Sequence, residues 1–329
     1  MQNMLWIYLL TFILSLCITV ITERRLIPFL RARAAQPIYE GGPAWHSTKK
    51  GTPTMGGVGF ILGIAVPLII FTITLIGAED FGEGYTLIFC LGYALLNALV
   101  GVFDDLKKLK RKENAGLSPT EKLALQFIIS GAYLWLWATV FGVNTELRLG
   151  FWDIDLGFFY YPVILLVMVG MTNFANLTDG IDGLASSVSL AIGAGIFFIT
   201  AYSSASVSTA ACALVGGAFG FLFFNANPAK IFMGDTGSLF LGALAVAALY
   251  SASVPLLILP LGIVYLIEGT SVVIQVLIFK LTGKRVFKMA PLHHHLEKSG
   301  WSETKICMAA LVLTLVSSLL VYFFKGAFP

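Results

Sequence analysis

The chain has 329 residues, of which 57% are hydrophobic and 12% are charged, and its formal net charge is +3. An ordinary soluble domain carries about 25% charged residues, so this composition excludes an ordinary soluble fold and indicates lipid as the main solvent. The cysteines form neither a CxxC pair nor a zinc-binding spacing, which indicates four small buried apolar residues, Cys17, Cys90, Cys212 and Cys307.

The first apolar stretch, residues 4–20, is followed by the charges Glu23-Arg24-Arg25. A secretory signal peptide has its positive charge first and ends at a small-residue cleavage site. Neither feature is present here, so this stretch is expected to be a retained membrane span.

Apolar stretches long enough to cross a membrane recur along the whole chain. Since a helix needs about 20 largely apolar residues to cross the hydrocarbon core, the sequence predicts a single all-α, polytopic membrane domain over residues 1–329. Its ten expected spans cover residues 4–22, 55–77, 85–103, 121–141, 160–177, 184–203, 206–226, 237–252, 256–279 and 305–325.

The basic residues orient these spans. Of the 21 lysines and arginines, all but Arg148 and Lys325 fall in one set of connecting segments. The positive-inside rule assigns this set to the cytoplasm and places both termini on the outer side. The set comprises residues 23–54, 104–122, 178–183, 227–236 and 280–305.

Two local patterns concern packing. Residues 142–159 alternate in a way that favours a small hairpin on the outer side. GxxxG spacings occur at Gly59/Gly63 and at Gly216/Gly220, and small residues at this spacing let helices approach closely in lipid.

The strongly polar motifs lie in the cytoplasmic set or beside it. The motif KKGTPTMGG at 49–57 offers a glycine backbone, the Thr54 hydroxyl and the charges of Lys49 and Lys50 to a phosphate. It lacks the GxxxxGK[ST] spacing of a Walker loop. A basic loop that serves orientation alone explains it equally well.

Asp104 and Asp105 directly follow the third predicted span. Adjacent carboxylates at a membrane boundary repel each other and are costly to desolvate, so a positive group must offset them. A divalent cation or the neighbouring Lys107 and Lys108 can do so, and an isolated solvated helix end is the competing interpretation.

The motif NLTDGIDGL at 176–184 is the most informative stretch. Asp179 and Asp182 lie three residues apart, Asn176 precedes them, and the glycines after each aspartate indicate a broken helix. Irregular polar backbone at membrane depth is tolerated where it is buried in protein or lines a wet cavity. One Asp-Gly pair is a good structural turn, but two pairs favour a functional site.

The motif FFNANPAKIFMGDTGS covers 223–238. Asp235 and Ser238 are placed at the start of the eighth span, where free N–H groups favour phosphate. A capping aspartate is the structural alternative, and Phe232 beside it is either a stacking surface for a base or a membrane-edge aromatic residue.

Three consecutive histidines in PLHHHLE, His293, His294 and His295, cannot all face one metal from a regular element, so two of them are expected to contact a ligand. Glu268 and Gln275 share one face of the ninth span, and polar side chains at that depth usually point into the bundle. Gln275, nearer the cytoplasmic end, is the better site candidate.

These motifs collect carboxylates, amides, histidines and lysines at one membrane face. Carboxylates without cysteine suit a hard cation, most plausibly Mg²⁺ with phosphate in its shell. Phosphoryl transfer needs charge neutralisation and in-line positioning. The residues alone therefore indicate a phosphate or diphosphate substrate that is handled at the membrane surface.

In this order and between these spans, the five motifs KGTPTMGG, VFDD, NLTDGIDGL, NANPAKIFMGDTGSLFLG and PLHHHLE closely resemble the phospho-N-acetylmuramoyl-pentapeptide transferase family. The resemblance covers about residues 20–300. It implies transfer of phospho-N-acetylmuramoyl-pentapeptide from its UDP-linked form to undecaprenyl phosphate, with release of UMP, in the bacterial cytoplasmic membrane. It also implies Mg²⁺ dependence, contact with membrane lipids, a homodimer and no nucleic-acid partner.

The resemblance also assigns residues. Asp235 is the expected metal ligand, Asp104 and Asp105 are the expected essential carboxylate pair, and His294 joins them as a catalytic candidate. The expected substrate-binding residues are Lys49, Thr54, Lys122, Asn176, Asp179, Asp182, Asn225, Phe232, Ser238, Gln275, His293 and His295.

Two routes are open for the transfer. Asp104 or Asp105 forms a covalent phospho-enzyme, or the lipid phosphate attacks directly while a carboxylate assists deprotonation. Direct attack is favoured because a phosphate monoester, with a second pKa of about 6, is already largely ionised near neutral pH.

Three other functions compete with this interpretation. The nearest is a transferase that loads N-acetylglucosamine-1-phosphate onto a polyprenyl phosphate, which the PLHHH run and the NLTDGIDGL form disfavour. A transporter or channel predicts mid-membrane charge and an internal repeat, whereas the acids collect at one face. A structural scaffold leaves the double Asp-Gly motif unexplained.

Overall fold

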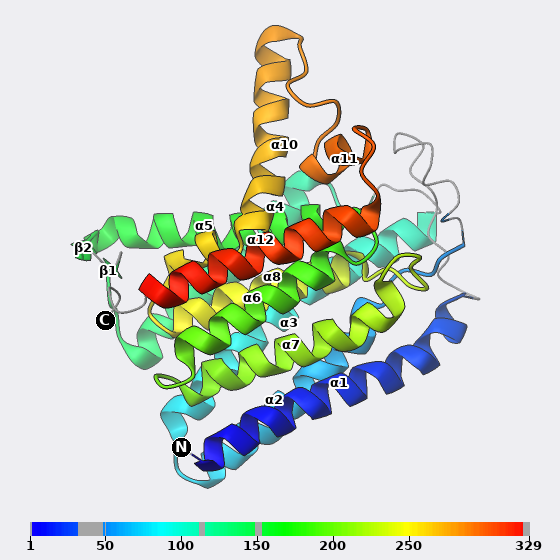
Figure 1. The fold of residues 1–329 in the computed structure, drawn as a ribbon. Coiled ribbons are helices and arrows are strands. Elements are labelled where there is room, and N and C mark those ends of the chain that lie inside the picture. The colour runs from blue at the N-terminus through cyan, green and yellow to red at the C-terminus, as the bar shows by residue number, and fades with distance from the viewer. Residues whose placement is uncertain (1, 32–48, 50, 112–115, 149–152, 325–329) are drawn as a thin grey trace.

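The apolar stretches form long helices that run side by side through one bundle in the computed structural model (Figure 1). The structure describes residues 2–31, 49, 51–111, 116–148 and 153–324. Its long helices are α1 (Gln2–Arg31), α2 (Gly57–Gly77), α3 (Phe81–Arg111), α4 (Pro119–Phe141), α5 (Tyr160–Thr178), α6 (Leu184–Thr200), α7 (Ala205–Asn225), α8 (Gly234–Ser251), α10 (Ile263–Thr282) and α12 (Glu303–Phe323).

Each predicted span coincides with one of these long helices, which confirms an all-α polytopic membrane fold. Within the described ranges, eight helices are long and apolar enough to cross a membrane. The other two are α6, which is one turn shorter than most, and α8, which opens with the polar turn 234–238. Three predicted ends were wrong, because α1 continues past residue 22 to Arg31, α3 continues past residue 103 to Arg111, and α10 begins at Ile263 and not at residue 256.

The shorter elements lie at the two ends of the bundle. The strands β1 (Glu146–Arg148) and β2 (Asp153–Asp155) pair antiparallel and confirm the predicted hairpin. A 3₁₀ turn, η2 (Gly157–Phe159), leads from the hairpin into α5. Another, η3 (Pro255–Leu257), and the single turn α9 (Ile258–Leu261) connect α8 to α10. The short helix α11 (Leu292–Glu297) lies beside the base of α10 (Figure 1).

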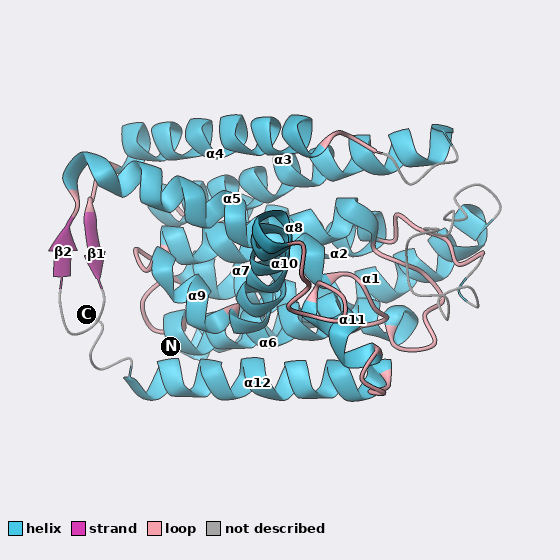
Figure 2. Ribbon diagram, turned by 90° about the horizontal axis from the view of Figure 1, so that it is seen from above, coloured by secondary structure: helices cyan, strands magenta, loops and turns pink. Residues whose placement is uncertain are grey.

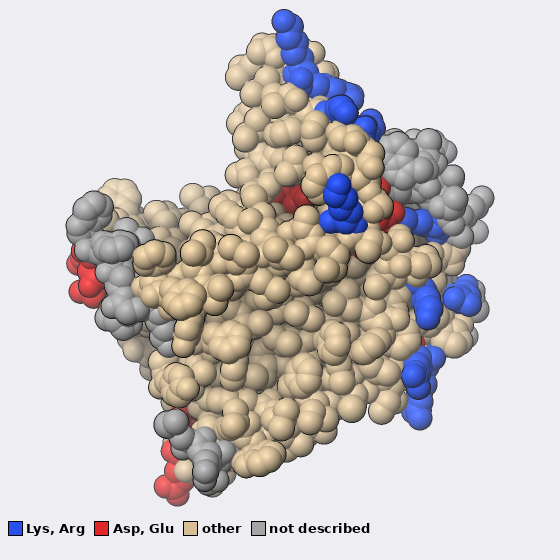
Figure 3. Space-filling view, in the orientation of Figure 1, with Lys and Arg blue, Asp and Glu red and all other residues tan. Residues whose placement is uncertain are grey.

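Charge is distributed between the ends as the sequence predicted. On the face drawn in Figure 3, Lys and Arg gather at one end of the bundle and along α10, whereas Asp and Glu lie at the hairpin end and near the foot of α10. Helix α1 begins and α12 ends at that hairpin end (Figure 1). The side of the membrane to which each end belongs stays a prediction.

Helix α10 leaves the bundle. It rises from the other helices in Figure 1 and is seen end-on in Figure 2. Its outer half presents large apolar side chains to the surroundings, with Leu277 at 55% and Leu281 at 82% exposed. Residues 283–291 then lead back to α11 at the bundle.

Helix α8 is the central helix. Its residues from Thr236 to Tyr250 are buried, and it packs against α3 and α5. Small side chains permit this approach, since a Cβ on Gly242 would lie 2.7 Å from the Cβ of Ala175 on α5. The polar start of α8 is therefore held at a fixed place between α3 and α5.

We expect Gly63→Ala to destabilise the contact between α1 and α2. A Cβ on Gly63 would lie 2.0 Å from Thr19 Oγ1, and overpacking costs about 1–3 kcal/mol. Thermal unfolding in detergent should show a lower melting temperature than for the control Gly92→Ala, since a Cβ on Gly92 has open space. Equal melting temperatures for the two variants would contradict this packing.

Candidate active site

Three carboxylates from two helices meet at the end of the bundle opposite the hairpin. One oxygen each from Asp104, Asp105 and Asp235 lies within 4.8 Å of the others. The close approach of α3 to α8 requires glycine, because a Cβ on Gly101 would lie 2.3 Å from the Asp235 carbonyl oxygen. Residues 131 positions apart in the chain thereby share one site.

Asp105 caps the start of α8. Its carboxylate accepts hydrogen bonds from the backbone N–H groups of Asp235 (3.1 Å) and Thr236 (3.0 Å) and from the Thr236 hydroxyl (2.7 Å). Both Asp105 oxygens are engaged, and the residue is 3% exposed. The predicted capping role near residue 235 therefore belongs to Asp105, and Asp235 projects its own carboxylate from the first turn.

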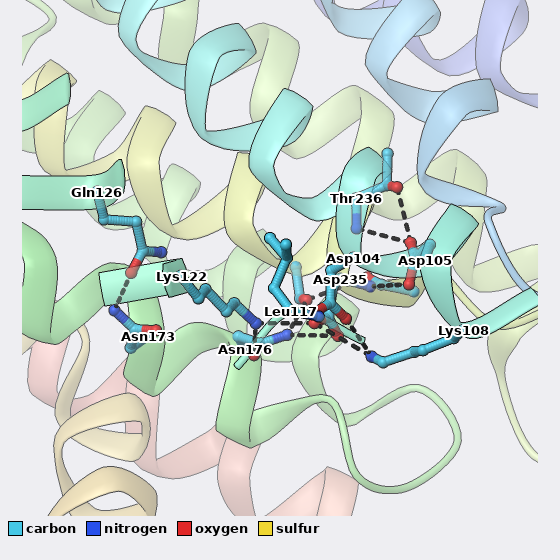
Figure 4. Close-up of polar contacts among 12 residues, drawn as sticks. Asp104, Asp105, Lys108, Leu117, Lys122, Gln126, Asn173, Asn176, Asp235 and Thr236 are labelled. Atoms are coloured by element: carbon cyan, nitrogen blue, oxygen red, sulfur yellow. Dashed lines mark hydrogen bonds and ion pairs between the residues drawn. The ribbon is translucent and has the colours of Figure 1, made fainter. Parts of the chain in front are cut away.

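Two lysines neutralise the cluster (Figure 4). Lys108 Nζ lies 2.6 Å from Asp104 Oδ2 and 3.2 Å from Asp235 Oδ2. Lys122 Nζ donates to Asp235 Oδ2 (2.7 Å) and to Asn176 Oδ1 (2.8 Å). The sequence predicted Lys108 only as one possible positive group that offsets Asp104 and Asp105. Its position one helical turn after Asp104 was the signal that placed it on the same face.

Asn176 links the cluster to α8 a second time. Its amide Nδ2 donates to Asp235 Oδ1 (3.1 Å) and to the Ser238 hydroxyl (2.8 Å). Asp104 Oδ1 accepts from the backbone N–H of Leu117 (2.7 Å), just before α4. Five of the predicted residues, namely Asp104, Asp105, Lys122, Asn176 and Ser238, thus surround Asp235.

The two aspartates of NLTDGIDGL differ in their contacts. The Asp182 carboxylate accepts from Lys49 Nζ (2.7 Å), Asn227 Nδ2 (3.1 Å) and Ala229 N (2.9 Å), so it ties three segments together. In the described part of the chain, the Asp179 carboxylate has neither a hydrogen bond nor an ion pair. Burial, and then the nearby charges of Asp235 and Asp105, hold the pKa of Asp179 well above its usual range.

Lys49 is also held between acids. Its Nζ contacts Asp182 and, at 2.7 Å, Glu303 Oε2 at the start of α12. Burial works against the charge on Lys49, but the hydrogen bonds to Asp182 and Glu303 outweigh it and raise the lysine pKa above its usual value. The neighbouring Lys50 lies outside the described residues.

Several other predicted residues form local ties. Asn225 is 2% exposed, accepts from Gly183 N and Ser186 Oγ, and donates to the Ile231 carbonyl. Gln275 makes three hydrogen bonds to the backbone of residues 286–287. Both amides therefore use their polar atoms to hold the chain around the site.

The segment that carries Thr54 lies along the start of α8. Pro53 O accepts from Phe232 N (2.9 Å), and Phe232 O accepts from Gly56 N (2.9 Å). Gly234, with φ of +70°, turns the chain where a Cβ would lie 2.5 Å from Asp105 Oδ2. The buried Thr54 hydroxyl is thereby brought close to Gly234 and Asp105, and the backbone of Phe232 ties this segment to the start of α8.

The three histidines have separate environments. His293 is fully buried, and its Nδ1 lies 3.1 Å from Glu268 Oε2. His294 Nδ1 lies 2.6 Å from Glu297 Oε2, and His295 Nδ1 accepts from the backbone N–H of Lys288 (3.1 Å). The sequence favoured Gln275 over Glu268 as the functional residue of α10, because a single acid within an apolar helix does not indicate its partner.

The donor set fits a hard divalent cation. Mg²⁺ takes oxygen ligands at about 2.0–2.1 Å and is usually bound through one or two carboxylates plus substrate phosphate. Asp104 and Asp235 each offer an oxygen, Oδ2, that pairs with lysine ammonium groups, whereas the Asp105 oxygens are already engaged by backbone and hydroxyl donors. These two residues would hold the ion.

We expect Asp105→Ala to lower thermal stability more than Asp104→Ala. Loss of a helix cap costs about 0.5–2 kcal/mol, and Asp105→Ala removes the acceptor of three donors, two of them buried. Asp104→Ala spares the cap and relieves repulsion among the carboxylates. Melting temperatures in detergent compare the two variants, and a larger loss for Asp104→Ala would contradict the capping role.

The raised pKa of Asp179 predicts a pH-dependent stability. An unfolded aspartate titrates near pH 3.9, so above that pH the folded state alone retains the proton and stability falls as pH rises through the folded pKa. Asp179→Asn removes this loss. In Mg²⁺-free buffer at pH 8, the melting temperature of the variant should exceed that of the parent protein, and at pH 4 the two should be equal. A gain in melting temperature that does not depend on pH would contradict the assignment.

Known proteins are similar to this chain over most of its length. Residues 87–253 match the model of glycosyl transferase family 4. The phospho-N-acetylmuramoyl-pentapeptide-transferase of Heliobacterium modesticaldum is 41% identical over 327 residues, which cover 97% of this chain and 97% of that protein. The enzyme of the same name from Bacillus subtilis is 43% identical over 306 residues, covering 91% and 92%. The chain belongs to glycosyl transferase family 4, within the phospho-N-acetylmuramoyl-pentapeptide transferases.

Proposed function

We propose that the protein transfers phospho-N-acetylmuramoyl-pentapeptide from its UDP-linked form to undecaprenyl phosphate and releases UMP. The observation that carries this proposal is the cluster of Asp104, Asp105 and Asp235, neutralised by two lysines, at one end of a membrane bundle. Relatives with the transferase name align over nearly the whole chain. They give no support to the N-acetylglucosamine-1-phosphate alternative.

The setting of the reaction follows from the charge distribution. We place the protein in the bacterial cytoplasmic membrane, with the acidic cluster at the cytoplasmic face and both termini outward, because the lysines and arginines gather at the cluster end (Figure 3). We further propose a homodimer surrounded by membrane lipids, with no nucleic-acid partner.

The residues of the cluster would each have a separate role in the transfer of the phosphosugar. Mg²⁺, when bound at Asp235 and Asp104, supplies charge neutralisation to the diphosphate. Lys108 and Lys122 lie within 3.2 Å of the same carboxylate oxygen and supply positive charge where phosphate oxygens must gather. The lipid phosphate attacks the phosphorus that carries the sugar, and UMP leaves with the electron pair of the broken P–O bond.

Asp104 is the better candidate to assist the attacking phosphate, since Asp105 is committed to the cap of α8. A covalent adduct of the sugar phosphate on Asp104 or Asp105 would contradict this direct route. His294 remains the histidine proposed for catalysis. The remaining residues proposed for the substrate pocket are Lys49, Thr54, Asn176, Asp179, Asp182, Asn225, Phe232, Ser238, Gln275, His293 and His295. Among them, Asn225, Gln275 and His293 would act by holding the chain that forms the pocket.

The proposal is tested by UMP release from the purified protein with UDP-N-acetylmuramoyl-pentapeptide, undecaprenyl phosphate and Mg²⁺. Asp235→Ala should lower turnover by about a hundredfold or more, the scale for loss of a main electrostatic stabiliser. Asp153→Asn, an exposed aspartate of β2, is the control and should retain parental turnover. Full Mg²⁺-dependent activity of Asp235→Ala, or turnover of UDP-N-acetylglucosamine alone, would refute the proposal.

A further inference from the structure

A buried acid and histidine pair connects α10 to α11 outside the acidic cluster. Glu268 is 4% exposed, and its Oε2 accepts from the backbone N–H of His293 and lies 3.1 Å from His293 Nδ1. A carboxylate only accepts hydrogen bonds, so Nδ1 carries the proton of this contact. The Glu268 carboxylate therefore fixes the orientation of the imidazole ring, with Nε2 directed away from α10.

The opposite edge of the His293 ring lies on the α5–α6 loop. A Cβ on Gly180 would be 2.1 Å from His293 Nε2, and Nε2 is buried without a hydrogen-bond partner among the described residues. Gly180 is not among the glycines with positive φ. The ring itself, and not the backbone conformation, therefore excludes a side chain at position 180.

Gly180 lies between the two aspartates of its loop. The Asp179 carboxylate, which has no hydrogen bond to the residues that the structure describes, lies near the charges of Asp235 and Asp105, and Asp182 is the anchor to Lys49. On the other side, the ring centroids of His293 and His294 are 4.2 Å apart. The buried pair thus sets the distance between the histidine segment and the Asp179–Asp182 loop.

We propose that Glu268 and His293 are positioning residues that hold this loop against the histidine segment and so shape the pocket for the nucleotide sugar. The inference rests on the proposed function. In the part of the chain that the structure describes, neither side chain forms a hydrogen bond or an ion pair with Asp104, Asp105 or Asp235. Their loss therefore weakens substrate binding and raises KM, while kcat changes less.

The steric contact gives a sharp test. Gly180→Ala and His293→Ala should each raise KM for UDP-N-acetylmuramoyl-pentapeptide by about tenfold, the scale of one lost hydrogen bond to a charged group. The double variant should have a lower KM than Gly180→Ala, because the missing ring leaves room for the new methyl group. Additive or worse KM values in the double variant would overturn the proposal, as would a fall in kcat at unchanged KM.

Conservative replacement tests the role of Glu268. The amide oxygen of Glu268→Gln can still accept from His293, so this variant should stay within about threefold of the parental KM, whereas Glu268→Ala should match His293→Ala. Glu146→Ala, at an exposed position of β1, is the control and should retain the parental KM. Equal KM values for Glu268→Gln and Glu268→Ala would overturn the inference.

Binding of UMP to the detergent-solubilised variants, measured by calorimetry, separates the possible failures. Weaker UMP binding at an unchanged melting temperature supports the positioning role, whereas parental UMP binding by Glu268→Ala and His293→Ala overturns it. Failure of the proposed function would give a different result. Either the parent protein would not turn over these substrates, or the Asp235→Ala variant would retain turnover.

Discussion

The site depends on the carboxylate of Asp105 at the start of α8. The first N–H groups of a helix have no partners within the helix and carry its positive end charge. The Asp105 carboxylate accepts from two of these groups and from one hydroxyl. Because α3 and α8 approach so closely at Gly101, this one contact sets the place of Asp235, and thereby of every group that contacts Asp235.

Charge balance explains why the cluster can be largely buried. Three carboxylates within a few ångströms would repel one another, but the ammonium groups of Lys108 and Lys122 both lie near Asp235 Oδ2. Three carboxylates and two ammonium groups leave one negative charge, which a lone divalent cation would turn into one positive charge. A cation bound together with a diphosphate would bring its own counter-charge, and Lys108 and Lys122 would hold positive charge next to the phosphate oxygens.

The sequence predicted the long helices well because the length and apolarity of each span follow directly from the thickness of a bilayer. It also predicted that Asp235 and Asn176 belong to one site. It could not predict that Asp105 caps α8 while Asp104 faces the lysines, since two adjacent residues of one type differ only through a packing contact at Gly101. The pairing of Glu268 with His293 was equally hidden, because the two partners lie 25 residues apart on two successive helices and no helical spacing relates them.

The ion pair between Lys49 and Glu303 joins residues 254 positions apart. Lys49 precedes the second long helix, and Glu303 opens the last one. The chain is synthesised from its amino end. Lys49 and Asp182 therefore lack their partner Glu303 until nearly every helix has been inserted. A chain that stops before α12 contains all the acids of the cluster yet leaves the Lys49 anchor incomplete. Assembly of this site is therefore one of the last events in the biogenesis of the protein.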